Sequence, residues 1–86
     1  MQPAPGQFET IILQLLSEAG TGRTISPTEA ARAIEPGPGW HLLMSQVRRT
    51  AVKLALAGRL VIYRKGKPVD PADFKGVYRL GLPRHD

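Results

Sequence analysis

The hydrophobic pattern of this 86-residue chain changes near Gly58, and this change constrains the fold more than any other feature. Before Gly58, apolar residues recur every three or four residues, which is typical of helices packed on a core. After Gly58, a short apolar run at residues 60–63 and an alternating pattern at residues 77–82 are typical of strands. A chain of this length fills one core only. We therefore expect one domain at residues 7–83, between a flexible leader (1–6) and a tail (84–86).

Three helices are expected in the first two thirds of the chain. The first covers residues 7–19, where one face carries an apolar stripe that begins at Phe8 and ends at Ala19. The second runs from Pro27 to Ile34, since Ser26 and Glu29 have the spacing of a capping box. The third begins at Trp40 or His41 and ends at Ala57, with Gly58 as its C-cap.

Two strands are expected after the helices, at residues 59–65 and 77–82, and residues 23–25 add a short extended segment. We expect Gly66, Lys67 and Pro68 to end the first strand, and Asp70 to cap a turn in the loop that follows. Asp70 is also expected to pair with Arg48 or Arg59. The fold class is thus mainly α with a small β wing, a winged helix-turn-helix of three helices and a two- or three-stranded antiparallel sheet. The predicted core contains Phe8, Ile12, Leu15, Leu16, Ile34, Leu43, Val47, Leu54, Leu60, Ile62 and Leu80.

Composition excludes several classes of protein. The chain has no Cys, so it has neither disulfides nor a thiolate metal site, and this favours a cytoplasmic location. The apolar run at residues 10–16 is too short to cross a bilayer. His41 has no partner at metal-ligand spacing, and Asp70 and Asp73 suit a turn better than acid–base catalysis. We expect no enzymatic activity, no metal, no cofactor and no membrane partner.

Charge is distributed unevenly along the chain. The net charge is +5, of which residues 1–39 contribute −2 (two bases, four acids) and residues 40–86 contribute +7 (ten bases, three acids). Such an asymmetry indicates a surface that faces a polyanion. The third helix and the wing would present basic side chains to duplex DNA. The helix would contact the edges of the nucleobases, and the wing would contact the phosphates. The candidate DNA-binding residues are Ser45, Arg48, Arg49, Lys53, Arg64, Lys65, Lys67 and Arg79.

A function other than DNA binding is also compatible with the sequence. The linker between the second and third helices is rich in Pro and longer than in most helix-turn-helix proteins, and Asp70 and Asp73 would repel phosphate. Leu42, Val52 and Leu56 lie off the core stripe of the third helix and would suit a protein partner or a homodimer. The sequence therefore predicts either a DNA-binding module, such as a transcriptional regulator, or an accessory domain that keeps the fold without binding nucleic acid.

The chain also resembles a family of uncharacterised bacterial domains, catalogued as a domain of unknown function. The most specific similarity is the stretch Gly66–Pro71, and weaker similarity covers Lys65, Trp40–Met44, Gly58–Arg59 and Tyr78–Leu80. Further matches are Pro27, Glu29, Ala31, Arg32, Val47, Arg48, Ala51, Leu54, Ala55 and Gly76. The resemblance implies a winged-helix-like fold and no catalytic residues. Leu42 and Leu56 depart from it, since more polar residues are usual there.

Overall fold

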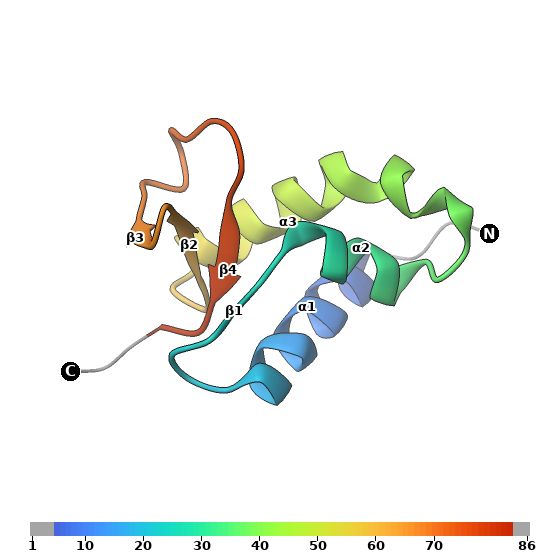
Figure 1. Cartoon of the computed structure of the whole chain (residues 1–86), viewed down its shortest axis with the longest axis horizontal. Coiled ribbons are helices and arrows are strands. Elements are labelled where there is room, and N and C mark those ends of the chain that lie inside the picture. Colours follow the sequence, from blue (N-terminus) through green and yellow to red (C-terminus); the bar gives the residue numbers. More distant parts are fainter. Residues whose placement is uncertain (1–4, 84–86) are drawn as a thin grey trace.

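The computed structural model describes residues 5–83, and it confirms three α-helices combined with a small antiparallel sheet (Figure 1). Most of the predicted leader, residues 1–4, and the predicted tail, residues 84–86, lie outside the described part. The elements in chain order are α1 (Pro5–Ala19), β1 (Thr24–Ile25), α2 (Pro27–Ile34), the 3-10 helix η1 (Pro38–Leu43), α3 (Met44–Leu56), β2 (Val61–Arg64), β3 (Lys67–Pro68) and β4 (Arg79–Gly81).

The sheet has four strands in the order β1-β4-β2-β3, with every neighbouring pair antiparallel. The sequence predicted two or three strands, and the additional one is the short edge strand β3. In the middle of the sheet, Leu80 pairs with Ile25 on one side and with Ile62 on the other. All three side chains are buried, so this row of cross-strand neighbours forms the apolar face of the sheet.

Helix α3 begins later than the sequence predicted. Residues 38–43 form a 3-10 helix, and the α-helix starts at Met44 rather than at Trp40 or His41. No residue of η1 is fully buried, and its apolar residues Trp40 and Leu43 are only half-buried against the core, so packing stabilises this segment less than it stabilises α3. Trp40 instead lies against the Arg32 guanidinium, whose carbon is 4.8 Å from the ring centre. Helix α1 differs in the opposite sense, since it begins at Pro5 and not at Gln7.

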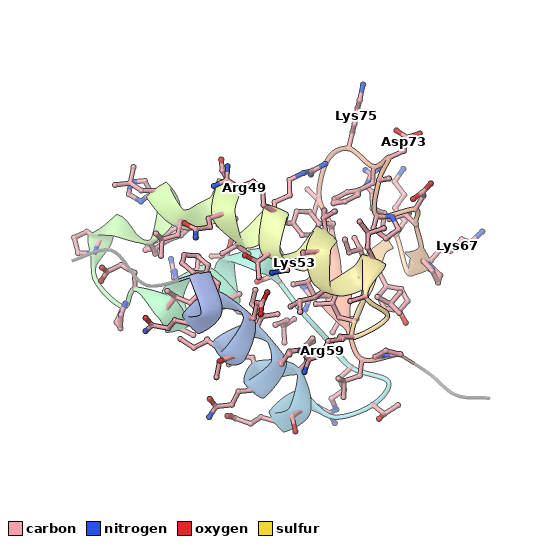
Figure 2. All side chains as sticks on the ribbon, turned by 180° about the vertical axis from the view of Figure 1, so that it is seen from behind. Arg49, Lys53, Arg59, Lys67, Asp73 and Lys75 are labelled. Carbon is pink, nitrogen blue, oxygen red and sulfur yellow. The ribbon has the colours of Figure 1, made fainter. Side chains whose placement is uncertain are left out.

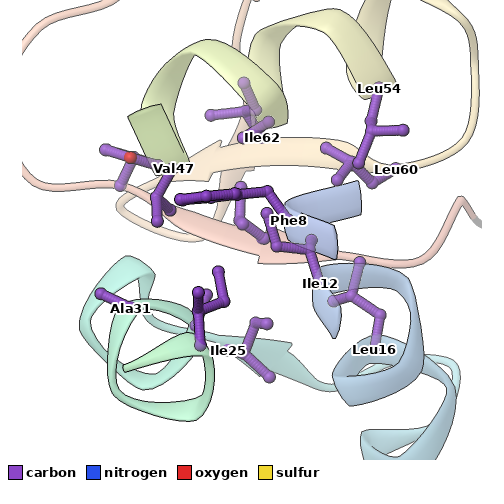
Figure 3. Close-up of a cluster of buried hydrophobic side chains, with 14 of the residues drawn as sticks. Phe8, Ile12, Leu16, Ile25, Ala31, Val47, Leu54, Leu60 and Ile62 are labelled. Carbon is purple, nitrogen blue, oxygen red and sulfur yellow. The ribbon is translucent and has the colours of Figure 1, made fainter. Parts of the chain in front are cut away.

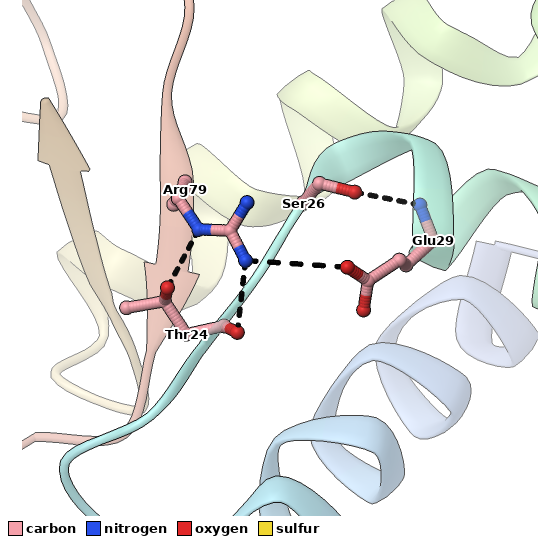
Figure 4. A network of polar contacts seen from close by, with 4 residues as sticks. All are labelled: Thr24, Ser26, Glu29 and Arg79. Carbon is pink, nitrogen blue, oxygen red and sulfur yellow. Dashed lines mark hydrogen bonds and ion pairs between the residues drawn. The ribbon is translucent and has the colours of Figure 1, made fainter.

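The helix-ending and helix-starting signals read from the sequence are largely confirmed. Gly58 donates to the carbonyl of Ala55, and Arg59 donates to that of Leu54, which is the hydrogen-bond pattern of a Schellman cap. At the start of α2, the Ser26 hydroxyl accepts a hydrogen bond from the Glu29 amide at 3.1 Å. The Glu29 carboxylate does not complete a capping box, because it faces Arg79 instead (Figure 4).

One apolar cluster lies between the three helices and the sheet (Figure 3). Most of the predicted core is buried, although Leu15 and Leu43 are only half-buried at its edge. Phe74 is the clearest omission, because it lies in a loop where no periodic pattern marks a buried position. The buried apolar residues are Phe8, Ile12, Leu16, Ile25, Ala30, Ala31, Ile34, Val47, Ala51, Leu54, Leu60, Ile62, Phe74, Tyr78 and Leu80.

The wing, which runs from β2 to β4 (residues 61–81), begins with a tight hairpin that the sequence did not predict. Arg64 pairs with Lys67, so the connection between β2 and β3 has only two residues, Lys65 and Gly66. Both have positive φ, 52° and 80°, as a type I′ turn requires, and glycine tolerates this conformation best. Pro68 was expected to end the strand, but a proline is tolerated on an edge strand because one side of that strand needs no donor.

Candidate nucleic-acid interface

One side of α3 takes no part in the core. Ser45, Arg49, Lys53 and Leu56 follow one another at spacings of four, four and three residues, and all four are exposed. We call this row the α3 ridge. Val47, Ala51 and Leu54 are buried on the opposite side of the helix, as the 3.6-residue period requires. Figure 2 shows the Arg49 side chain extending away from the body of the molecule.

Lys53 is tied to the first helix. Its Nζ lies 2.8 Å from Oε1 of Glu9 on α1, in a pair whose side chains are 75% and 28% exposed. The hydrogen bond from Lys53 and its positive charge hold the pKa of Glu9 below its ordinary value. Lys53 is therefore exposed, but its charge is partly neutralised.

Removing the cation should raise the pKa of Glu9. In the Lys53→Met variant, the carboxyl loses both the hydrogen bond and the charge that favour its ionised form, so its pKa should rise towards its ordinary value. Since the folded-state pKa is the lowered one, the pair stabilises the fold above the unfolded pKa, and this contribution disappears as the pH falls through the folded value. An NMR titration of the Glu9 carboxyl carbon in both proteins measures the shift, and equal midpoints would contradict it.

Arg48 anchors the wing loop (residues 69–78, between β3 and β4), but not through Asp70 as predicted. Its Nη2 donates to the backbone carbonyl of Phe74 at 2.6 Å, and its guanidinium carbon lies 3.9 Å from the centre of the Phe74 ring. The Asp70 carboxylate instead accepts from the Ala72 amide at 2.9 Å within its own turn. Within residues 5–83 no cationic nitrogen lies within 4.0 Å of Asp70, so the predicted ion pair with Arg48 or Arg59 is wrong. The Asp-capped turn itself is confirmed.

Arg64 holds the end of the wing loop. Its Nε donates to the carbonyl of Val77 at 3.0 Å, and its guanidinium lies over Gly76. A Cβ atom on Gly76 would come within 2.8 Å of Nη2 of Arg64, and the φ of +86° also favours glycine at this position. Arg64 is therefore committed to the backbone of the loop.

Arg79 joins the wing to the start of α2. Its Nε donates to the Thr24 hydroxyl at 2.6 Å, its Nη2 donates to the Thr24 carbonyl at 3.1 Å, and the same Nη2 lies 4.0 Å from Oε1 of Glu29 (Figure 4). These contacts link β4 to β1 and to the first turn of α2. Like Arg48 and Arg64, Arg79 has a role in holding the fold together.

The structure thus divides the eight candidates into two groups. Arg48, Lys53, Arg64 and Arg79 have partners within the domain, whereas Ser45, Arg49, Lys65 and Lys67 are exposed and make no side-chain hydrogen bond or ion pair with other described residues. Arg49 and Ser45 lie on the α3 ridge, and Lys65 and Lys67 lie at the tip of the hairpin. Lys75, which is not one of the eight candidates, is also exposed, at the tip of the wing loop (Figure 2).

Among residues 5–83, no three His, Cys, Asp or Glu side chains are grouped so that they would hold a metal ion. None of the described helices has the length and apolar character needed to cross a membrane.

The three α-helices and the four-stranded sheet form a small α+β domain with the element order of a winged helix. Residues 5–83 match the model of a family described as "Protein of unknown function (DUF3253)", and the chain belongs to this family. This match confirms the resemblance to a domain of unknown function. No curated protein matches the chain.

Proposed function

We propose that this domain is a non-enzymatic module that binds duplex DNA, of the kind that transcriptional regulators use in the bacterial cytoplasm. The main support is Arg49, an exposed cation in the middle of the α3 ridge with no partner among residues 5–83. A long cationic side chain on an exposed helix face is suited to the major groove, where arginine binds both acceptors of guanine. Ser45, one turn earlier, is suited to a base edge or a phosphate.

The hairpin lysines supply the second part of the proposal. Lys65 and Lys67 flank Gly66 at a turn that projects from the sheet, and both are exposed. Point charges on such a turn attract phosphates without selecting a sequence. The proposed division is therefore that the α3 ridge contributes base contacts and the hairpin contributes phosphate contacts.

Two sets of variants test this division by fluorescence anisotropy with labelled duplexes. Lys65→Ala combined with Lys67→Ala should weaken binding to all sequences alike, by roughly five- to tenfold per lysine at 0.1 M salt, and should flatten the salt dependence. Arg49→Ala should also change the preference among sequences. Arg23→Ala is the matched control, because Arg23 is an exposed base in the turn between α1 and β1, away from α3 (Figure 1). Equal losses in all three proteins would contradict the division.

The exposed apolar side chains favour a second candidate function, a protein-interaction domain. Leu42, in η1, is 79% exposed, and Leu56, the last residue of α3, is 66% exposed. In this alternative the domain forms a homodimer or binds a protein partner through that segment. Sedimentation of the wild type and of Leu56→Asp separates the two candidates, since an apolar dimer would dissociate in the variant whereas a monomeric DNA-binding domain would be unaffected.

A further inference from the structure

The wing loop, residues 69–78, contains a small aromatic core of its own. Phe74 and Tyr78 are each only 7% exposed, and their rings meet edge-on at 5.2 Å with an interplanar angle of 66°. Burial raises the pKa of Tyr78, and the nearby Arg48 cation opposes this shift. A loop that buries two aromatic rings has fewer accessible conformations than an exposed loop of the same length. The positions of its exposed residues are therefore defined.

Arg48 attaches this loop to α3. The guanidinium stacks on Phe74 and lies 5.7 Å from the Tyr78 ring centre, while Nη2 donates to the Phe74 carbonyl. That carbonyl belongs to the peptide bond between Phe74 and Lys75. The contact thus fixes the backbone immediately before Lys75 to the helix residue immediately before Arg49.

Each of the two attached residues is followed in the sequence by an exposed cation. Arg49 comes after Arg48 on α3, and Lys75 comes after Phe74 in the loop. Neither has a hydrogen bond or an ion pair with another residue in the described range 5–83. Figure 2 shows both side chains extending from the same edge of the molecule, with Asp73 beside Lys75 on the loop.

We propose that Lys75 is a phosphate-binding residue of the DNA interface and that Arg48 is its positioning residue. This inference rests on the proposed function. With Arg49 in the groove, Lys75 would bind a phosphate on the strand that borders it, as a cation held in place before the DNA arrives. A preorganised contact of this kind avoids the cost of ordering a loop during binding. Asp73 opposes the contact through its negative charge, so its removal should strengthen binding.

The test measures duplex affinity by anisotropy at two salt concentrations. Lys75→Ala should weaken binding roughly five- to tenfold at 0.1 M salt and reduce the salt slope by about 1. Arg48→Lys keeps the charge but loses the planar stacking, so it should lose part of the same contribution. In the Lys75→Ala background, Arg48→Lys should cause no further loss, whereas Lys67→Ala should add its full effect in either background. Asp73→Asn should raise the affinity in the wild type but less so in the Lys75→Ala variant.

The outcomes separate this inference from the proposed function. If the wild type binds duplex DNA and Lys75→Ala binds equally well, the phosphate contact is wrong and the proposed function stands. If Arg48→Lys and Lys75→Ala give additive losses, the positioning role is wrong. If the wild type does not bind, the proposed function fails. Thermal unfolding checks each variant, and Phe74→Leu, which removes the ring but keeps the apolar volume, replaces Arg48→Lys if that protein is not folded.

Discussion

Replacing Phe8 with alanine is expected to destabilise the domain by about 3–5 kcal/mol. Phe8 has no exposed surface, and it is the largest of the fully buried side chains in the described part of the chain. Its ring lies in the middle of the cluster in Figure 3, so truncation leaves a cavity that its neighbours cannot fill without moving. A domain of this size has a total stability of roughly 4–13 kcal/mol, so the loss is a large share of it.

Chemical denaturation followed by circular dichroism measures the difference in the free energy of unfolding between the Phe8→Ala variant and the wild type. A loss of this size should lower the midpoint of thermal unfolding by on the order of 15–30 °C. Leu56→Ala is the matched control, because Leu56 is 66% exposed and its truncation should change stability by less than about 0.5 kcal/mol. If the two variants lost similar stability, α1 would not pack on the core as described.

The helical part of the fold could be predicted from local patterns. The stripe that begins at Phe8, the Ser26 cap and the Gly58 stop are each encoded within a few neighbouring residues, and the structure confirms all three. The start of α3 could not be predicted in the same way. Trp40 continues the apolar spacing of the helix, but its ring lies beside Arg32 of α2. Because Arg32 belongs to another helix, the periodic pattern of α3 does not reveal this contact.

The wing shows a second limit of local patterns. A proline directly after Gly66 and Lys67 indicates the end of a strand, yet these residues form the turn and the edge strand of a hairpin. The register of such a pair depends on the positive φ of both turn residues, and Lys65 gives no sign of it because lysine has no preference for that conformation. The pairing is therefore visible only in the folded chain.

The sequence predicted the candidate site as a set of seven basic residues and one serine, but it did not predict the role of each residue. Helical spacing places Arg49 outward and Val47 inward correctly, because both follow from the period of one helix. Arg48, Arg64 and Arg79 instead bind backbone carbonyls at residues 13 to 55 positions away in sequence. A loop with unpaired carbonyls needs donors, and arginine supplies several in a fixed plane. Which arginines serve this purpose depends on the tertiary arrangement alone.

We propose that exposed cations of α3 and the wing bind the phosphates and bases of duplex DNA. Arg49, Lys65 and Lys67 are the proposed contacts, and Lys75 adds a fourth. Three or four contacts predict that the logarithm of the binding constant falls with the logarithm of salt concentration with a slope of about −3. Affinity should then fall on the order of 50- to 150-fold between 50 and 200 mM salt.

A titration of a labelled random-sequence duplex with the wild-type domain, at 50 mM and at 200 mM salt, tests this DNA binding. The expected result is a dissociation constant on the order of 10⁻⁴–10⁻⁶ M near physiological salt, and much tighter binding at the lower concentration. A domain that leaves the duplex unbound at 50 mM salt, or binds it equally at both concentrations, would contradict the claim.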